Sequence, residues 1–113
     1  FGSEEQKARV LPELAGGKCL GGFGLTEPGS GSDAAGLRTV ATRDGDDWLL
    51  NGEKAWITNA HEAHAAIVFA TTDPAKGWAG LSAFIVERDD EGFSVGAKED
   101  KMGIRSSDTV PLD

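Results

Sequence analysis

The sequence predicts a small, mainly β domain, an antiparallel β-barrel or sandwich, preceded by a short helical segment. Apolar and β-branched runs recur at even spacing and are separated by turn-forming clusters, with no long helical pattern between them. The chain of 113 residues contains 16 glycines, which suit tight turns and sheet corners. This length fits one domain with a single modest core.

The helical segment is predicted at the N-terminal end. Ser3 and Gln6 have the spacing of a capping box, in which each side chain satisfies a backbone group of the other residue. We expect Pro12 to limit this helix and to open a second helical turn as its first residue. The Gly16-Gly17 pair is expected to end the helical region.

The strands follow from residue 38 onward. Residues 38–43 are rich in β-branched side chains, and a turn at Asp44-Gly45-Asp46 joins them to the apolar residues 48–50, which predicts a hairpin. Turn clusters such as Asp73-Pro74 divide the rest of the chain. The remaining candidate strands are residues 55–58, 65–71, 81–86 and 93–95.

Charge and composition exclude several classes of partner. The formal net charge of −8 opposes binding to nucleic acid or to an anionic membrane, because both would repel the chain. No apolar run approaches the roughly 20 residues of a membrane-spanning helix. Cys19 is the only cysteine, so an internal disulfide is impossible and a reducing compartment is favoured. The chain begins at Phe1 without a signal region and stops in an extended segment, which we interpret as a piece of a longer polypeptide.

No metal site is predicted. His61 and His64 are three residues apart, whereas the zinc helix of metalloproteases needs histidines four apart, and no third ligand is evident. The acidic residues 44–47 lack the alternating ligands and the closing glutamate of an EF-hand loop. Surface histidines and a solvated turn explain these residues.

The loop Gly24 to Asp33, with the sequence GLTEPGSGSD, is a candidate phosphate site. Backbone N–H groups of a Gly/Ser-rich turn can form a concavity for phosphate oxygens, and serine hydroxyls add donors without bulk. No Lys-Ser/Thr pair follows the glycines, so this is not a Walker loop, and no Rossmann helix opens after it. An ordinary tight turn is the alternative interpretation.

Trp56 and Thr58 are candidates for contacts with a planar ligand. On a regular strand they would point to the same face, roughly 7 Å apart, offering an aromatic plane and a hydroxyl to one ring system. Spacing alone favours a simpler interpretation, in which Trp56 is a core residue beside a strand threonine. A further segment, residues 101–109, is polar and predicts only a surface loop.

Together, three stretches resemble the signatures of the acyl-CoA dehydrogenase family. They are TEPGSGSD at residues 26–33, GEKAWITN at residues 52–59 and KMGIRSSDT at residues 101–109, with FIVE at residues 84–87 between the last two. Their order and spacing agree as well as their content, over nearly the whole chain. In that family a middle β-barrel domain lies between two helical domains. The resemblance implies that residues 1–18 end the N-terminal helical domain and that residues 19–113 form the flavin-binding barrel.

The resemblance also implies FAD as the cofactor and acyl-CoA as the substrate. The segment from Phe23 to Ser32 would line the flavin, with the Thr26 hydroxyl near the pyrimidine edge. Ser32 would lie near both the pyrophosphate and the acyl-CoA. Trp56 would pack on the flavin ring and Thr58 would hydrogen-bond to N5. The full set of implied cofactor contacts is Phe23, Leu25, Thr26, Gly31, Ser32, Trp56, Ile57 and Thr58.

The implied reaction is the α,β-desaturation of acyl-CoA thioesters in fatty acid β-oxidation, with hydride transfer to flavin N5. The family's catalytic glutamate belongs to the C-terminal helical domain, so no catalytic base is expected among these residues. A homotetrameric parent that passes electrons to electron-transfer flavoprotein, in the bacterial cytoplasm or the mitochondrial matrix, is also implied. Three alternatives remain: an acyl-CoA oxidase-like relative, a nitroalkane-oxidase-like relative and a non-catalytic β-barrel binding module.

Overall fold

One helix, α1 (Glu4–Ala15), opens the computed structural model, which describes residues 1–113. The predicted capping box is present, because the Gln6 N–H donates to Ser3 Oγ at 3.1 Å and the Ser3 N–H donates to Gln6 Oε1 at 2.9 Å. The helix gives way at Gly16 and Gly17, where Gly17 adopts a φ of 67°. No helix of the structure is both long and apolar enough to cross a membrane.

The expected limit at Pro12 was wrong, because Pro12 lies inside one continuous helix. Proline lacks the backbone donor to the Ala8 carbonyl and crowds that carbonyl, which makes it costly inside a helix. The Pro12 carbonyl nevertheless accepts a hydrogen bond from the Gly16 N–H at 2.9 Å. Helical hydrogen bonding therefore continues past Pro12, and the helix ends only at Ala15.

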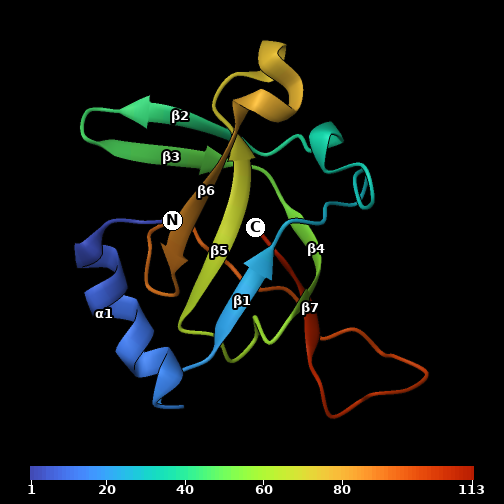
Figure 1. Ribbon diagram of the computed structural model, residues 1–113. Helices are drawn as coiled ribbons and strands as arrows, with labels where there is room; N and C mark the ends of the chain where they lie inside the picture. Colours follow the sequence, from blue (N-terminus) through green and yellow to red (C-terminus); the bar gives the residue numbers. More distant parts are fainter.

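The remaining chain forms two open β-sheets, which confirms the prediction of a mainly β domain behind a short helix (Figure 1). The larger sheet contains β1 (Gly21–Gly24), β2 (Val40–Asp44), β3 (Asp47–Asn51), β5 (Ala65–Thr71) and β6 (Leu81–Glu87). The smaller sheet pairs β4 (Lys54–Thr58) with β7 (Thr109–Leu112). Two short 3₁₀ segments, η1 (Ala34–Gly36) and η2 (Pro74–Gly80), lie between strands.

The larger sheet is mixed and the two sheets do not close into a barrel, which corrects the expectation of purely antiparallel pairing. The pairs β2·β3, β5·β6 and β4·β7 are antiparallel, whereas β1 and β5 run parallel, from Gly21 opposite Ala65 to Gly24 opposite Val68. A single parallel pair, Val40 opposite Thr71, connects β2 to β5. Strands β1 and β2 therefore both run in the same direction as β5.

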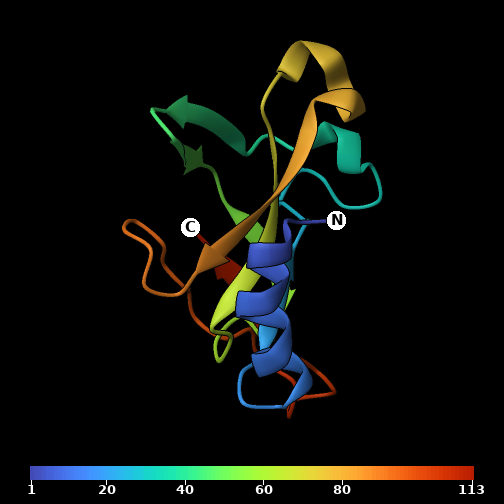
Figure 2. The ribbon, with the colours of Figure 1, turned by 60° about the vertical axis from the view of Figure 1, so that its left-hand side comes forward.

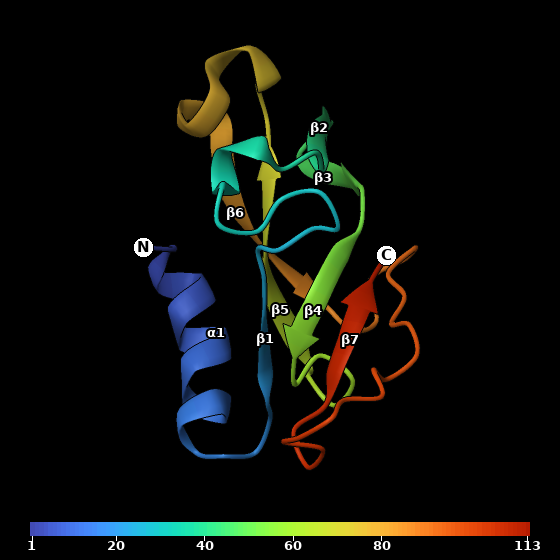
Figure 3. The ribbon, with the colours of Figure 1, turned by 90° about the vertical axis from the view of Figure 1, so that its right-hand side faces the viewer.

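The core lies between the two sheets, where β4 and β7 stand beside β1 (Figure 3). Gly22 of β1 faces this core, where a Cβ on it would make ordinary van der Waals contact with the Ala66 Cβ at 3.4 Å and Ile57 Cγ2 at 3.6 Å. The largest fully buried side chains are Ile57 and Val110. The core cluster consists of Ile57, Ala60, Ala66, Val68, Val110 and Leu112.

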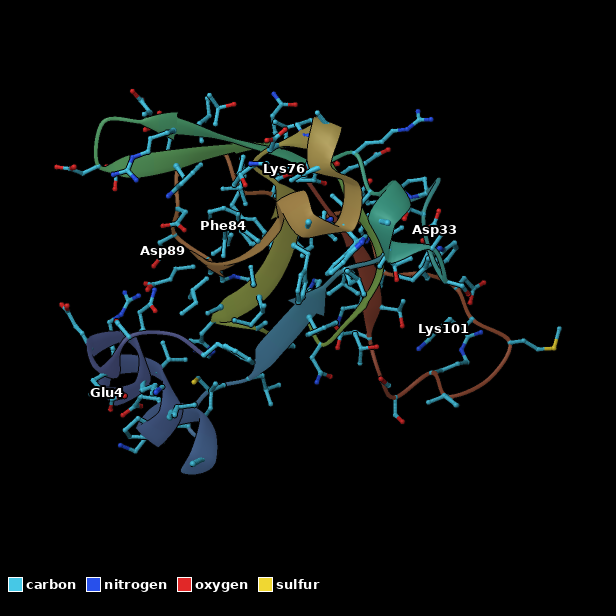
Figure 4. The ribbon with its side chains drawn as sticks, turned by 45° about the horizontal axis from the view of Figure 1, so that its top comes forward. Glu4, Asp33, Lys76, Phe84, Asp89 and Lys101 are labelled. Atoms are coloured by element: carbon cyan, nitrogen blue, oxygen red, sulfur yellow. The ribbon has the colours of Figure 1, made fainter.

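The predicted hairpin is confirmed as β2 and β3, and it projects from the body of the domain (Figure 2). Gly45 adopts a φ of 61° in the turn. Trp48 anchors the hairpin by packing edge-on against Phe84 of β6, with ring centroids 5.5 Å apart. Figure 4 shows Phe84 below the hairpin.

The predicted strands at 55–58, 65–71 and 81–86 correspond to β4, β5 and β6, while two differences remain. The strand predicted at 93–95 is absent, because only Val95 forms a bridge, opposite Leu112. Strand β1 was not predicted as a strand, since three of its four residues are glycines. Its pairing comes from β5, so no local pattern reveals it.

Candidate functional site

A groove of about 360 Å³ lies where the end of β1 faces β4. Its volume falls within the range of small-molecule sites. Four of its lining residues are hydrophobic. The lining residues are Gly21, Phe23, Leu25, Thr26, Trp56, Ile57, Thr58 and Asn59. Six of the eight residues predicted to contact the cofactor therefore share one groove.

Trp56 is 60% exposed, so the interpretation of this residue as a core tryptophan was wrong. It does not lie on a regular strand, because the pairing of β4 with β7 shifts register between Lys54 and Ile57, and Trp56 adopts a φ of 63°. A positive φ costs a bulky residue free energy and persists only where the surroundings hold it. The buried neighbours Ala55 and Ile57 hold it here, and Trp56 and Thr58 both remain exposed at the groove.

The opposite wall of the groove comes from β1 and the residues after it. Phe23 is 60% exposed, and its ring packs against Phe69 of β5 at a centroid distance of 5.2 Å. The Thr26 carbonyl accepts a hydrogen bond from the Ala55 N–H at 2.8 Å. This bond joins the two walls directly next to Trp56.

The rest of the predicted loop forms a tight turn beyond the groove. Glu27 and Ser30 exchange backbone hydrogen bonds of 2.8 and 3.1 Å, and the Ser30 hydroxyl donates to the Asp33 carbonyl at 2.5 Å. Gly31 and Ser32 are exposed and are not among the groove's lining residues. The figure with side chains labels Asp33 on this loop, next to η1 (Figure 4).

A buried ion pair joins the turn to β4. Glu27 Oε1 lies 2.7 Å from Lys54 Nζ, and the two side chains are only 6% and 3% exposed. The carboxylate also accepts the Thr39 hydroxyl at 2.5 Å, the Thr39 N–H at 3.0 Å and the Arg38 N–H at 2.6 Å. Lys54 Nζ donates in addition to the Leu25 carbonyl at 3.3 Å.

These contacts keep Glu27 ionised. Burial would raise the pKa of Glu27, but the hydrogen bonds from Lys54, Thr39 and the backbone outweigh it and lower the pKa to about 2. Burial also lowers the pKa of Lys54, and the Glu27 carboxylate opposes that effect. A carboxylate with such a low pKa and four donors is a poor proton acceptor, so Glu27 is unsuited to act as a general base.

A second cavity, of about 540 Å³, lies on the other side of Glu27 and has no hydrophobic lining residue. Its lining includes the acidic residues Glu27, Glu53 and Asp113 and the basic residue Arg38. A planar aromatic ring system gains from apolar and aromatic walls. The smaller groove therefore suits such a ligand better, although the second cavity is larger.

Residues 22–113 match the family model described as acyl-CoA dehydrogenase, middle domain. The chain belongs to the acyl-CoA dehydrogenase family. The probable acyl-CoA dehydrogenase fadE25 of Mycobacterium leprae is 55% identical over 111 residues, which cover 98% of this chain and 28% of that protein. The mitochondrial short-chain specific acyl-CoA dehydrogenase of Homo sapiens is 53% identical over 112 residues, covering 99% of this chain and 27% of that protein.

Solved structures agree with this membership. A chain in the structure of the electron transferring flavoprotein of Acidaminococcus fermentans superimposes with a TM-score of 0.97 at 49% identity, covering 99% of this chain and 30% of that one. The glutaryl-CoA dehydrogenase of Mycobacterium smegmatis in complex with FADH2 gives a TM-score of 0.91 at 49% identity, covering 99% and 28%. This acyl-CoA dehydrogenase middle domain thus spans less than a third of each of these proteins.

Three features of the candidate site were not predicted from the sequence. Gly21 and Asn59 line the groove, and the Glu27–Lys54 pair joins its two walls. Asn59 belongs to the GEKAWITN stretch, so its position beside Thr58 offered a signal. Gly21 and the ion pair offered none, because both depend on residues that lie 27 or more positions apart in the sequence.

Proposed function

We propose that this chain is the FAD- and acyl-CoA-binding middle segment of a larger acyl-CoA dehydrogenase. The observation that carries the proposal is the groove, in which Phe23, Thr26, Trp56 and Thr58 come together from two distant segments. The groove offers exposed aromatic faces and hydroxyls to a planar, polar-edged ring. In this assignment residues 1–18 end an N-terminal helical domain and residues 19–113 form the flavin-binding domain.

The groove residues have distinct parts in this function. FAD, when bound, supplies the hydride acceptor for α,β-desaturation of an acyl-CoA thioester. Trp56 offers an apolar wall on which the flavin ring would pack, and Phe23 opposite it would exclude water. The Thr58 hydroxyl would donate to N5, and the Thr26 hydroxyl would bond to the pyrimidine edge.

The remaining predicted contacts extend along the same loop and strand. Leu25 and Ile57 line the groove beside these side chains. Gly31 and Ser32 lie farther along the turn, where FAD would place its pyrophosphate beyond the flavin ring. Ser32 would contact acyl-CoA as well. A Cβ on Gly31 would meet no atom within 4 Å, so the backbone there is open to a ligand.

We assign the catalytic base to a C-terminal helical domain outside these residues, consistent with the low pKa of Glu27. We therefore expect that the purified 113-residue chain will not desaturate any acyl-CoA. The full-length enzyme is proposed to be a homotetramer of the bacterial cytoplasm or the mitochondrial matrix that reduces electron-transfer flavoprotein. Turnover by the isolated chain would contradict the assignment of the base.

The test of the proposed function uses the full-length protein that carries this segment. It should purify with a flavin absorption spectrum, and anaerobic addition of an acyl-CoA should bleach that spectrum. A colourless protein that takes up no FAD on reconstitution would instead indicate a non-catalytic binding module. Aerobic peroxide production at the rate of turnover would indicate an oxidase-like relative.

Matched variants connect this result to the groove. Trp56→Ala and Thr58→Val should each weaken FAD binding by about fivefold or more, since a lost stacking face or hydrogen bond costs of order 1 kcal/mol or more. Trp78→Ala and Thr42→Val are the controls, because Trp78 is 79% exposed on η2 and Thr42 is exposed on β2, both outside the groove. Equal effects of both pairs would refute the placement of the flavin.

A further inference from the structure

The Glu27–Lys54 pair lies between the two walls of the groove without lining it. Glu27 directly follows Thr26 of one wall, and Lys54 stands two residues before Trp56 of the other. Lys54 Nζ also donates to the Leu25 carbonyl, and the Ala55 N–H donates to the Thr26 carbonyl. Three hydrogen bonds thus connect consecutive residues of one wall to the start of β4.

The carboxylate also fixes a third segment. Its bonds to the Arg38 N–H and to both donors of Thr39 hold residues 38–39 against the turn. Thr39 in turn packs against Gly52, where a Cβ would lie 2.6 Å from Thr39 Oγ1 and 2.7 Å from Thr39 Cα. The carboxylate is therefore the shared centre of a network that reaches the residues just before β4.

Stability alone is a weak explanation for this pair. Removing two charges from water is costly, and well-packed apolar side chains of similar volume often stabilise a protein as well or better. Buried ionic groups instead impose a fixed geometry, because each charge requires its partner and its remaining hydrogen bonds at defined positions. Here that geometry sets the separation of the groove's walls.

We propose that the Glu27–Lys54 ion pair is a positioning device that holds the wall of residues 23–26 and the wall of residues 56–59 at the separation that the flavin requires. This inference rests on the proposed function. Neither side chain contacts the cofactor in this arrangement, and both act through Thr26, Trp56 and Thr58. Breaking the pair loosens the groove and changes the environment of the flavin ring.

The experiment uses the full-length, FAD-loaded enzyme. Glu27→Gln keeps the shape of the side chain but removes its charge, and Lys54→Met keeps the apolar stem but removes the ammonium. Both should weaken FAD binding by about tenfold or more and alter the flavin absorption spectrum, because small misplacements at a site have large effects. Binding is measured by FAD titration of the apoenzyme.

Val86→Ala is the matched control for general loss of stability. Val86 packs against the core from β6, and no groove residue comes from that strand. It should lower the melting temperature while leaving FAD affinity and the spectrum unchanged. If Glu27→Gln and Lys54→Met both stay within about threefold of the wild-type FAD affinity, or if Val86→Ala weakens binding equally, the proposal is overturned.

Two further results have a defined meaning: charge variants that do not fold, and a wild-type enzyme that binds no flavin. Should the charge variants be recovered unfolded, Thr39→Val decides the question, because it removes only the hydroxyl donor to Glu27 and keeps the backbone donor. It should weaken FAD binding and alter the spectrum in a folded enzyme, and wild-type affinity and spectrum would overturn the proposal. A wild-type enzyme that binds no flavin would refute the proposed function itself, which separates the two failures.

Discussion

Protonation of Glu27 should remove a measurable part of the folding free energy of this chain at acid pH. The pKa of Glu27 is lowered from 4.5 to about 2 by its hydrogen bonds with Lys54, Thr39 and the backbone, which outweigh the opposing effect of burial. Between pH 4.5 and about 2, the Glu27 carboxylate binds a proton more readily in the unfolded chain than in the folded one. The contribution of ionised Glu27 to the free energy of unfolding is therefore fully present above pH 4.5 and is lost as the pH falls through about 2.

The magnitude follows from the two pKa values. A difference of about 2.5 corresponds to roughly 3 kcal/mol, since each pKa unit is worth about 1.4 kcal/mol. The side chain is only 6% exposed, so solvent screens this contribution little. A similar cost, about 3–5 kcal/mol, is typical when one partner of a buried ion pair is removed.

Urea unfolding at a series of pH values measures this effect, with far-UV circular dichroism and the fluorescence of the three tryptophans as probes. The wild-type free energy of unfolding should exceed that of Glu27→Gln by roughly 3 kcal/mol near pH 6, and the gap should nearly close by about pH 2. Other carboxylates titrate in both proteins and cancel in the difference. A gap that stays constant across this range would refute the reasoning.

Three further substitutions test the packing of the domain and the cap of α1. Gly52→Ala should lower the free energy of unfolding by about 2 kcal/mol or more, because a Cβ there would lie 2.6 Å from Thr39 Oγ1 at a φ of 151°. Gly29→Ala is the control, since a Cβ at that position would meet no atom within 4 Å. Equal melting temperatures of the two variants would contradict the prediction. Val110→Ala leaves a cavity at a fully buried position and should lower the free energy of unfolding by about 2 kcal/mol. A loss below about 0.5 kcal/mol would count against the assigned core. Ser3→Ala removes the cap of α1 and should increase amide exchange in its first turn by about fivefold, whereas unchanged exchange would show that the capping box is not formed.

The sequence determined the local features of this protein. The capping box, the Gly45 turn and the runs that become β5 and β6 depend on neighbouring residues, so the pattern alone placed them. Two of the three family stretches, TEPGSGSD and GEKAWITN, likewise contain residues that meet at the groove, whereas KMGIRSSDT contributes none. Among the local predictions, the limit of the helix at Pro12 and the strand at 93–95 were wrong, since α1 continues through Pro12 and only Val95 forms a bridge.

Only the tertiary structure decided which of these segments meet and how. Three features depend on residues that lie far apart in the chain. They are the parallel pairing of glycine-rich β1 with β5, the exposure of Trp56 at a bulge and the burial of Glu27 against Lys54. Such contacts form because burial of apolar area and pairing of buried charges are optimised over the whole fold, and no local period records them. For that reason the sequence named six of the eight groove residues, while the fold alone brought Glu27 and Lys54 together as a buried ion pair.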